Sequence, residues 1–135
     1  MYISETSIRV RYSETDQMGY VYYGNYATYY EVARVESLRQ LGLTYREIEE
    51  MGVMMPVLEN RSKYLAPARY DDLLRVVTTL REKPSVRIRF EYEIFNSENT
   101  LIHQGETTLV FINKITNRPC RQPPAMEKVL EPFFQ

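Results

Sequence analysis

Residues 12–26 read YSETDQMGYVYYGNY, and this stretch indicates both the fold and the chemistry of the chain. It runs from a strand-like segment through an acidic turn and a group of tyrosines into a long helix, which is predicted from Asn25 to Leu41. Asp16 therefore lies a few residues before a helix N-terminus, where unpaired backbone N–H groups favour negative charge. A carboxylate base or nucleophile beside N–H groups that stabilise an oxyanion is suited to acyl transfer.

The long helix is expected to be the central element of the fold. Asn25 can cap its N-terminus, and Gly42 can adopt the left-handed conformation that ends a helix. Its apolar residues cover more than one stripe of the surface: Tyr26, Tyr29, Tyr30, Val32, Ala33, Val35, Leu38 and Leu41. A helix with so broad an apolar surface is predicted to be covered on most of its sides.

Glu31 is a second carboxylate on this helix and an alternative to Asp16 as the catalytic group. Its spacing from Arg34, three residues further on, favours a structural ion pair instead. Glu36 and Arg39 have the same spacing and are predicted to pair in the same way.

Strands dominate the rest of the chain. The first is predicted over residues 2–13, and a short helix with a Thr44–Glu47 capping box and a closing Gly52 follows the long helix. The later expected strands cover residues 57–65, 73–80, 86–95 and 101–115, and a short helix is expected near residues 126–130. Strands joined by short turns form antiparallel sheets. The prediction is one α+β domain, residues 1–135, in which a curved antiparallel five-stranded sheet wraps around one long central helix.

Composition excludes several classes of function. The 135 residues include 17 basic and 18 acidic side chains, so the net charge of −1 gives no reason to expect nucleic-acid binding. No apolar run approaches the ~20 residues of a membrane span, and no signal peptide is visible. Cys120 is the only cysteine, which fits a reducing compartment. We expect a cytoplasmic protein without membrane insertion.

The single histidine limits the catalytic chemistry. With only His103 and Cys120, the chain cannot assemble a His/Cys metal cluster, and no metal or cofactor is expected. His103 lies in an alternating, strand-like run, where a solvent-facing or hydrogen-bonded histidine is expected rather than a member of a catalytic triad. If the chain is a hydrolase, a carboxylate must perform the acid–base work.

The pattern Asp16-x-x-Gly19-x-Val-Tyr-Tyr-x-Asn25-Tyr26, followed by Glu31 and Arg34, resembles the hotdog-fold acyl-CoA thioesterases of the 4-hydroxybenzoyl-CoA thioesterase type. The similarity in element order extends over nearly the whole chain. Weaker markers are Tyr64-x-x-Pro67 leading to Asp71-Asp72, the strand with Gly105, and the ending Arg118-Pro119.

The resemblance implies the roles of the site residues. Asp16 would be the catalytic carboxylate, as nucleophile or as general base for water. The backbone N–H of Tyr23, with that of Gly24, would hold the thioester carbonyl. Many family members have histidine at the position of Tyr23, and this difference concerns substrate preference more than reaction type, because a backbone N–H requires no particular side chain.

Other residues are expected to bind substrate. Tyr22, Asn25 and Tyr26 lie at the predicted helix start nearest Asp16, whereas tyrosines further along the helix are expected in the core. Arg87 and Arg89 alternate with apolar residues on one strand; they are either a solvated face or contacts for the phosphates of CoA.

The resemblance also implies the partners. The substrate would be a small or medium acyl-CoA or an acyl group on acyl carrier protein. Two chains would join their sheets edge to edge in a homodimer, with further pairing into a homotetramer and the active site at the dimer interface. The alternative is a hotdog module that binds acyl-CoA or acyl carrier protein without catalysis, since a fold alone does not determine function.

Overall fold

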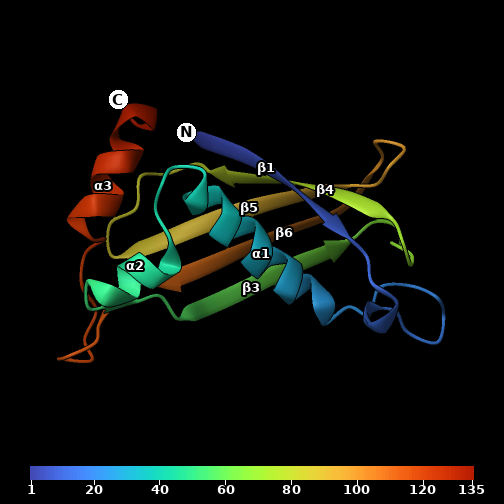
Figure 1. The fold of residues 1–135 in the computed structure, drawn as a ribbon, viewed down its shortest axis with the longest axis horizontal. Coiled ribbons are helices and arrows are strands. Elements are labelled where there is room, and N and C mark those ends of the chain that lie inside the picture. The colour runs from blue at the N-terminus through green and yellow to red at the C-terminus, as the bar shows by residue number, and fades with distance from the viewer.

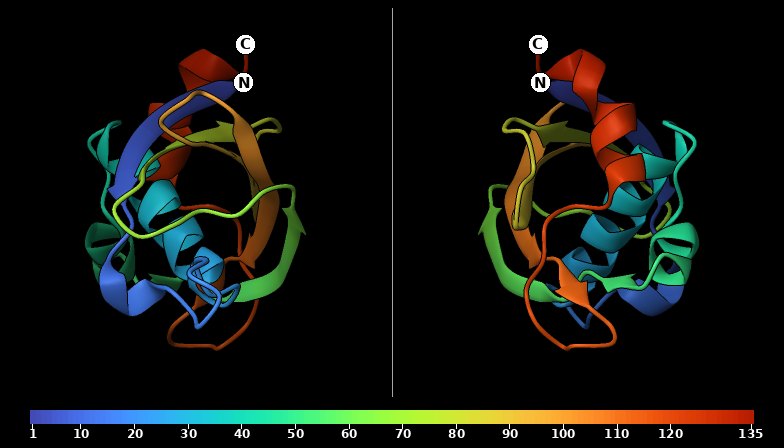
Figure 2. Two further views of the ribbon diagram at one scale, coloured as in Figure 1. Left: turned by 90° about the vertical axis from the view of Figure 1, so that its right-hand side faces the viewer. Right: turned by 90° about the vertical axis from the view of Figure 1, so that its left-hand side faces the viewer.

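The computed structural model describes residues 1–135 and has one curved antiparallel sheet with one long helix on its concave side (Figure 1). The strands in spatial order are β1 (Tyr2–Arg9), β4 (Leu73–Leu80), β5 (Arg87–Phe95), β6 (Leu101–Val110) and β3 (Val57–Tyr64). The views along the sheet show it curling around α1 (Asn25–Arg39) (Figure 2). The predicted fold class is confirmed.

The alternation of apolar and polar residues in the strands determines which face is buried. In β5, Ile88, Phe90, Tyr92 and Ile94 are buried against the helix. Arg87, Arg89 and Glu93 are exposed on the outer face. Since successive side chains of a strand point to opposite faces, this alternation allows only one face of β5 to pack against the helix.

The helix α1 is covered on one side only. Its buried residues are Tyr26, Tyr29, Tyr30, Ala33, Arg34, Ser37 and Leu38. The opposite side, which includes Glu31 and Val32, is exposed in the single chain. The predicted covering on most sides is therefore not provided within one chain, because the sheet reaches around only part of the helix.

The ends of α1 differ partly from the prediction. Asn25 is not the cap: it is the first helical residue, and its Nδ2 donates to the backbone oxygen of Glu14 at 2.8 Å. Gly42 takes the left-handed conformation as predicted, with φ of 82°, and the N–H of Leu43 donates to the carbonyl of Leu38 at 3.1 Å. This hydrogen bond closes the helix after Arg39, two residues before the predicted end.

One predicted ion pair on α1 forms and the other does not. Arg39 Nε lies 3.2 Å from Glu36 Oε1, as predicted. The predicted pair between Glu31 and Arg34 is wrong: Arg34 is buried under the sheet, whereas Glu31 faces solvent.

The other elements lie mostly at the far end of the helix (Figure 1). They are α2 (Tyr45–Glu50), α3 (Pro124–Leu130) and the short strands β2 (Val53–Met54) and β7 (Ile112–Asn113), which pair with each other. The capping box before α2 is present, with Glu47 N–H donating to Thr44 Oγ1 at 3.1 Å. The strand expected over residues 101–115 is divided, because β6 ends at Val110 and β7 pairs with β2 instead of β3. No helix is both long enough and apolar enough to cross a membrane.

The first predicted strand is shorter than expected. The strand β1 ends at Arg9, and residues Tyr12–Glu14 form a turn of 3₁₀ helix, η1. The Glu14 carboxylate accepts from the Arg11 N–H at 2.8 Å, which turns the chain toward the start of α1.

Gly105 of β6 is required by close packing against α1. A Cβ atom at this position would overlap the hydroxyl and ring of Tyr30. Tyr30 has little freedom to move, since its ring stacks on Tyr92 at 4.4 Å and its hydroxyl contacts Ser62 Oγ at 2.7 Å.

We predict that Gly105→Ala lowers the free energy of unfolding by about 1–3 kcal/mol, the usual cost of overpacking a core. Urea unfolding monitored by circular dichroism measures this loss. Gln104→Ala, at the adjacent exposed position, is the control and should change stability little. Equal stability of Gly105→Ala and the wild type would contradict the close packing.

Candidate active site

A mostly apolar pocket lies where the Asp16 turn meets the start of α1 and the chain after β3. Its volume is about 310 Å³, and its lining residues are Asp16, Met18, Tyr20, Val21, Tyr23, Tyr26, Tyr64, Leu65, Ala66 and Pro67. Asp16 is the one carboxylic acid among them. The structure thus brings three predicted site residues, Asp16, Tyr23 and Tyr26, to one pocket.

The Asp16 carboxylate is held by one oxygen and free at the other. Oδ1 accepts from the backbone N–H groups of Met18 at 2.9 Å and Tyr20 at 3.1 Å. The turn is closed by Asp16 N–H, which donates to the Tyr20 carbonyl at 2.8 Å, and by Gly19 at φ of 81°. Oδ2 has no hydrogen-bond partner in the chain, so the turn fixes the carboxylate and leaves one oxygen for chemistry.

The backbone N–H groups of Tyr23 and Gly24 make no hydrogen bond within the chain. The neighbouring groups are satisfied: Tyr22 N–H donates to the Glu14 carbonyl at 2.9 Å, and Asn25 N–H to the Tyr22 carbonyl at 2.9 Å. Free N–H groups at a helix start are ready to donate hydrogen bonds to an anion or to the oxygen of a polarised carbonyl.

Glu14 connects the Asp16 turn to α1. Its carboxylate accepts from the Tyr29 hydroxyl at 3.0 Å and from Arg11 Nη2 at 2.9 Å, while its carbonyl accepts from Tyr22 and Asn25. Burial alone would raise the pKa of Glu14, but the hydrogen bonds from Arg11 and Tyr29 outweigh it and lower the pKa below its usual value. The sequence showed the acidic turn, but its partner Tyr29 lies fifteen residues away and only the fold brings it near.

Tyr26 forms one wall of the pocket and is supported from behind by His103. The two rings stack with centroids 4.0 Å apart, and Tyr64 packs edge-on against Tyr26 at 5.5 Å. His103 is fully buried, and its Nε2 is hydrogen-bonded with the Tyr30 hydroxyl. Burial lowers the pKa of His103 to about 4, so the ring is neutral at physiological pH. Of the two expected states, solvent-facing and hydrogen-bonded, His103 has the second, and it does not line the pocket.

Three residues predicted at the helix start do not line the pocket. Tyr22 is 47% exposed and packs against the Tyr23 ring at 4.6 Å. The side chain of Asn25 is engaged with Glu14, and Gly24 precedes α1 without lining the pocket.

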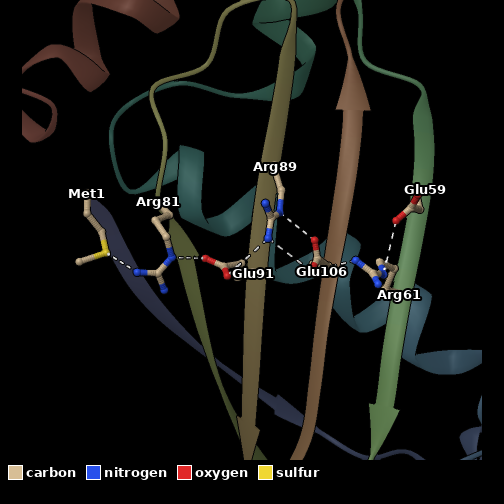
Figure 3. Close-up of polar contacts among 7 residues, drawn as sticks. All are labelled: Met1, Glu59, Arg61, Arg81, Arg89, Glu91 and Glu106. Carbon is tan, nitrogen blue, oxygen red and sulfur yellow. Dashed lines mark hydrogen bonds and ion pairs between the residues drawn. The ribbon is translucent and has the colours of Figure 1, made fainter.

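Arg87 and Arg89 lie on the outer face of the sheet, away from α1. Figure 3 shows Arg89 in a row of alternating charges that runs from Arg81, just after β4, across β5 and β6 to β3. Arg89 Nε is 2.7 Å from Glu106 Oε2, and Arg81 Nε is 2.8 Å from Glu91 Oε2. A larger, polar cavity of about 510 Å³ lies along this face, but Asp16 and the helix start do not line it. The site with both a free carboxylate oxygen and free N–H groups is the smaller, apolar one.

The end of β3 and the bend that follows it were not predicted to be part of the site. Tyr64, Leu65, Ala66 and Pro67 line the pocket. The sequence signal was the Tyr64-x-x-Pro67 marker, which indicated a bend, but no local pattern shows that this bend packs beside the Asp16 turn.

Comparison with known proteins agrees with this geometry. The family model of the thioesterase-like superfamily matches residues 10–130. The putative acyl-CoA thioesterase YneP of Bacillus subtilis is 32% identical over 119 residues, which are 88% of this chain and 86% of YneP. The acyl-CoA thioester hydrolase YbgC of Escherichia coli O157:H7 is 33% identical over 116 residues, which are 86% of this chain and 87% of YbgC.

A solved structure shows the same fold. The crystal structure of a DHNA-CoA thioesterase from Staphylococcus aureus superposes with a TM-score of 0.93 at 34% sequence identity, and the match covers 98% of this chain and 91% of that one. The chain belongs to the thioesterase-like superfamily and has its hotdog fold, as the sequence predicted.

Proposed function

We propose that the chain hydrolyses acyl-CoA thioesters, with Asp16 as the catalytic carboxylate and the N–H groups of Tyr23 and Gly24 as the oxyanion site. One observation carries this proposal: Asp16, with one free carboxylate oxygen, and Tyr23, with a free N–H that Gly24 continues just before the helix, line a single apolar pocket. The similarity to acyl-CoA thioesterases supports the same reaction class.

The reaction needs no group beyond the carboxylate, the N–H donors and water. With Asp16 as base, the carboxylate takes a proton from water as the water oxygen attacks the thioester carbon; the C–S bond then breaks, and CoA leaves as the thiol with the proton held by Asp16. With Asp16 as nucleophile, Oδ2 attacks directly, the CoA thiolate leaves, and water then hydrolyses the resulting anhydride. In both routes the carbonyl oxygen becomes negative and is stabilised by the N–H donors, a contribution of about 3–4 kcal/mol per donor in other acyl-transfer enzymes.

The lining of the pocket indicates the acyl group. Apart from Asp16, its side chains are uncharged and mainly aromatic or aliphatic, and its volume of about 310 Å³ suits a small or medium apolar acyl group. Tyr26 and Tyr64 pack edge to face with their ring centroids 5.5 Å apart, so together they form an aromatic wall that favours a flat or compact group against it.

The carrier of the acyl group is CoA or acyl carrier protein, and Arg87 and Arg89 remain our candidates for the phosphate contacts. Arg87 is exposed and forms no ion pair within the chain, which leaves its guanidinium available. Arg89 would have to share its guanidinium between a phosphate and Glu106. Both arginines lie on the outer face, opposite to the pocket. They can contact the phosphates only if the carrier extends around the sheet, or if the carrier is bound in the pocket of a neighbouring copy of the chain. A cytoplasmic location also stays our prediction.

The exposed strand β3 supports the prediction of a homodimer that can pair further into a tetramer. Every residue of this edge strand is exposed, including Val57, Leu58 and Tyr64. An exposed edge strand is an open template for pairing with another chain, and natural proteins cover such edges. Pairing along β3 would bring the neighbouring bend at Tyr64–Pro67, and so the pocket, close to the second chain.

We expect light scattering at micromolar concentration to show a dimer or tetramer. Leu58→Lys, which places a charge on this edge, should increase the monomer fraction, because apolar edge contacts are lost. An active monomer of the wild type at the same concentration would contradict an interface at the site.

We predict that Asp16→Asn lowers the rate of acyl-CoA hydrolysis by about 10²- to 10⁴-fold. The amide keeps the oxygen that accepts from Met18 and Tyr20 but cannot act as base or nucleophile. Release of free CoA, detected with a thiol reagent, measures the rate. Retained circular dichroism and thermal midpoint would show that the fold is intact.

Asp72→Asn is the matched control for this substitution. Asp72 is also a turn carboxylate whose oxygen accepts from a backbone N–H, that of Arg69 at 2.8 Å, but it does not line the pocket. We expect activity within a few-fold of the wild type. If Asp16→Asn behaves like Asp72→Asn, Asp16 is a turn residue, and a binding module without catalysis becomes the better account.

A further inference from the structure

The exposed edge strand β3 carries opposite charges on its outer face. Ser62 Oγ contacts the Tyr30 hydroxyl of α1 at 2.7 Å, so Ser62 points toward the helix. Successive side chains of a strand alternate between the two faces, and the side chains on either side of Ser62 therefore point away from the helix. The outer face of β3 thus presents Glu59, Arg61 and Lys63, all of which are exposed.

The row of alternating charges in Figure 3 is tightly bonded inside the sheet and loosely bonded at its β3 end. Inside the sheet, Arg89 Nε lies 2.7 Å from Glu106 Oε2. At the edge, Arg61 Nη1 lies 3.9 Å from Glu106 Oε1, and Arg61 Nε lies 3.6 Å from Glu59 Oε1. Both edge distances are too long for hydrogen bonds. The last two charged groups of the row therefore have room for closer partners.

The charges on β3 restrict how this strand can pair with the β3 of a second copy. Directly opposite residues of an antiparallel pair point to the same face, and in a two-fold dimer each contact occurs twice. A register centred on Glu59, Arg61 or Lys63 places that residue opposite its own copy, and like charges directly opposite destabilise a sheet. A register centred on Ser62 places Arg61 opposite the partner's Lys63, again with like charges. Only a register centred on Asn60 places opposite charges together, since Glu59 then faces the partner's Arg61.

We propose that β3 pairs with the β3 of a second copy in the register centred on Asn60, with two reciprocal pairs between Glu59 and the partner's Arg61. This inference rests on the pairing along β3 proposed above and defines how the two strands meet. In this register each Arg61 lies between Glu106 of its own chain and the partner's Glu59, so the row of alternating charges continues from one sheet into the other. The pattern favours a second copy over another protein, because the two-fold symmetry gives each of these charges its opposite.

Charge reversal at either position tests this register. We expect Glu59→Arg and Arg61→Glu each to weaken dimerisation by about tenfold, because two attractive cross-strand contacts become repulsive. Sedimentation velocity over a range of concentrations measures the change. Both positions are exposed, so neither reversal disturbs the core, and circular dichroism checks the fold.

Lys63→Glu is the matched control for these variants. It also reverses a charge on the outer face of β3, but in the proposed register residue 63 lies opposite the apolar bulge formed by the partner's Val57 and Leu58. We therefore expect Lys63→Glu to dimerise like the wild type.

A mixture of the two reversed variants separates the register from a general effect of charge. A Glu59→Arg chain presents two arginines at these positions, and an Arg61→Glu chain presents two glutamates. In the proposed register both cross-strand pairs of their heterodimer are attractive. Native mass spectrometry resolves the homodimers and the heterodimer by mass. We expect the heterodimer to dominate an equimolar mixture, and its excess to fall as the ionic strength rises.

Two kinds of result overturn the proposal, and they are distinguishable. A wild type that stays monomeric at micromolar concentration contradicts pairing along β3 itself. A dimeric wild type contradicts the register alone if Lys63→Glu weakens dimerisation as much as Arg61→Glu does, or if the heterodimer reaches only its statistical share of the mixture. None of these measurements uses the hydrolysis of acyl-CoA, so they do not depend on the proposed reaction.

Discussion

The contact between Glu14 and the start of α1 is the constraint on which the site depends. The carboxylate of Glu14 binds the Tyr29 hydroxyl, and its backbone oxygen binds Asn25 Nδ2 and the Tyr22 N–H. These bonds fix the Asp16 turn, two residues further on, against the helix. The Tyr22 N–H already donates to the Glu14 carbonyl, so the next free N–H groups of the chain are those of Tyr23 and Gly24. The same buried residue therefore positions the Asp16 carboxylate and leaves free the two N–H groups that we propose as oxyanion donors.

The helix contributes to the site in a second way, through one row of side chains that faces β5, β6 and β3. Tyr26, Tyr30 and Arg34 follow one another at intervals of four residues and so share a side of α1. Tyr26 stacks on His103 at the pocket, Tyr30 stacks on Tyr92, and Arg34 lies beside Tyr92 in turn. This part of the core is aromatic and polar, whereas the buried residues of β4 are mostly aliphatic. Gly105 leaves room for Tyr30 in this row, which explains a glycine inside a long strand.

The sequence predicted the fold well because its strongest signals are local. Apolar and charged residues alternate in residues 86–95, and the Thr44–Glu47 box and Gly42 behave as expected because each depends on neighbours a few residues away. The errors came from contacts between distant residues. Asn25 was expected to cap the helix, but Glu14 engages its amide; Glu31 and Arg34 were expected to pair, but the curvature of the sheet buries one of them and not the other.

The same distinction applies to the site. Asp16 and the helix start are close in sequence, so their meeting could be predicted. The wall formed by Tyr64–Pro67 could not, because it depends on how the end of β3 packs beside a turn about fifty residues earlier. The alternation of residues 86–95 placed Arg87 and Arg89 together on one face of a strand. In the structure this is the outer face of the sheet, which is opposite to α1 and the pocket.

The most direct test of the central claim is a crystal structure with an acyl-CoA analogue in which a methylene group replaces the thioester sulfur, so that hydrolysis is blocked. The account predicts that the carbonyl oxygen lies within hydrogen-bond distance of the Tyr23 N–H, with the free oxygen of Asp16 facing the carbonyl carbon and the acyl group packed against the wall of Tyr26 and Tyr64. A carbonyl bound on the outer face of the sheet, or in the pocket but remote from Asp16, would contradict it.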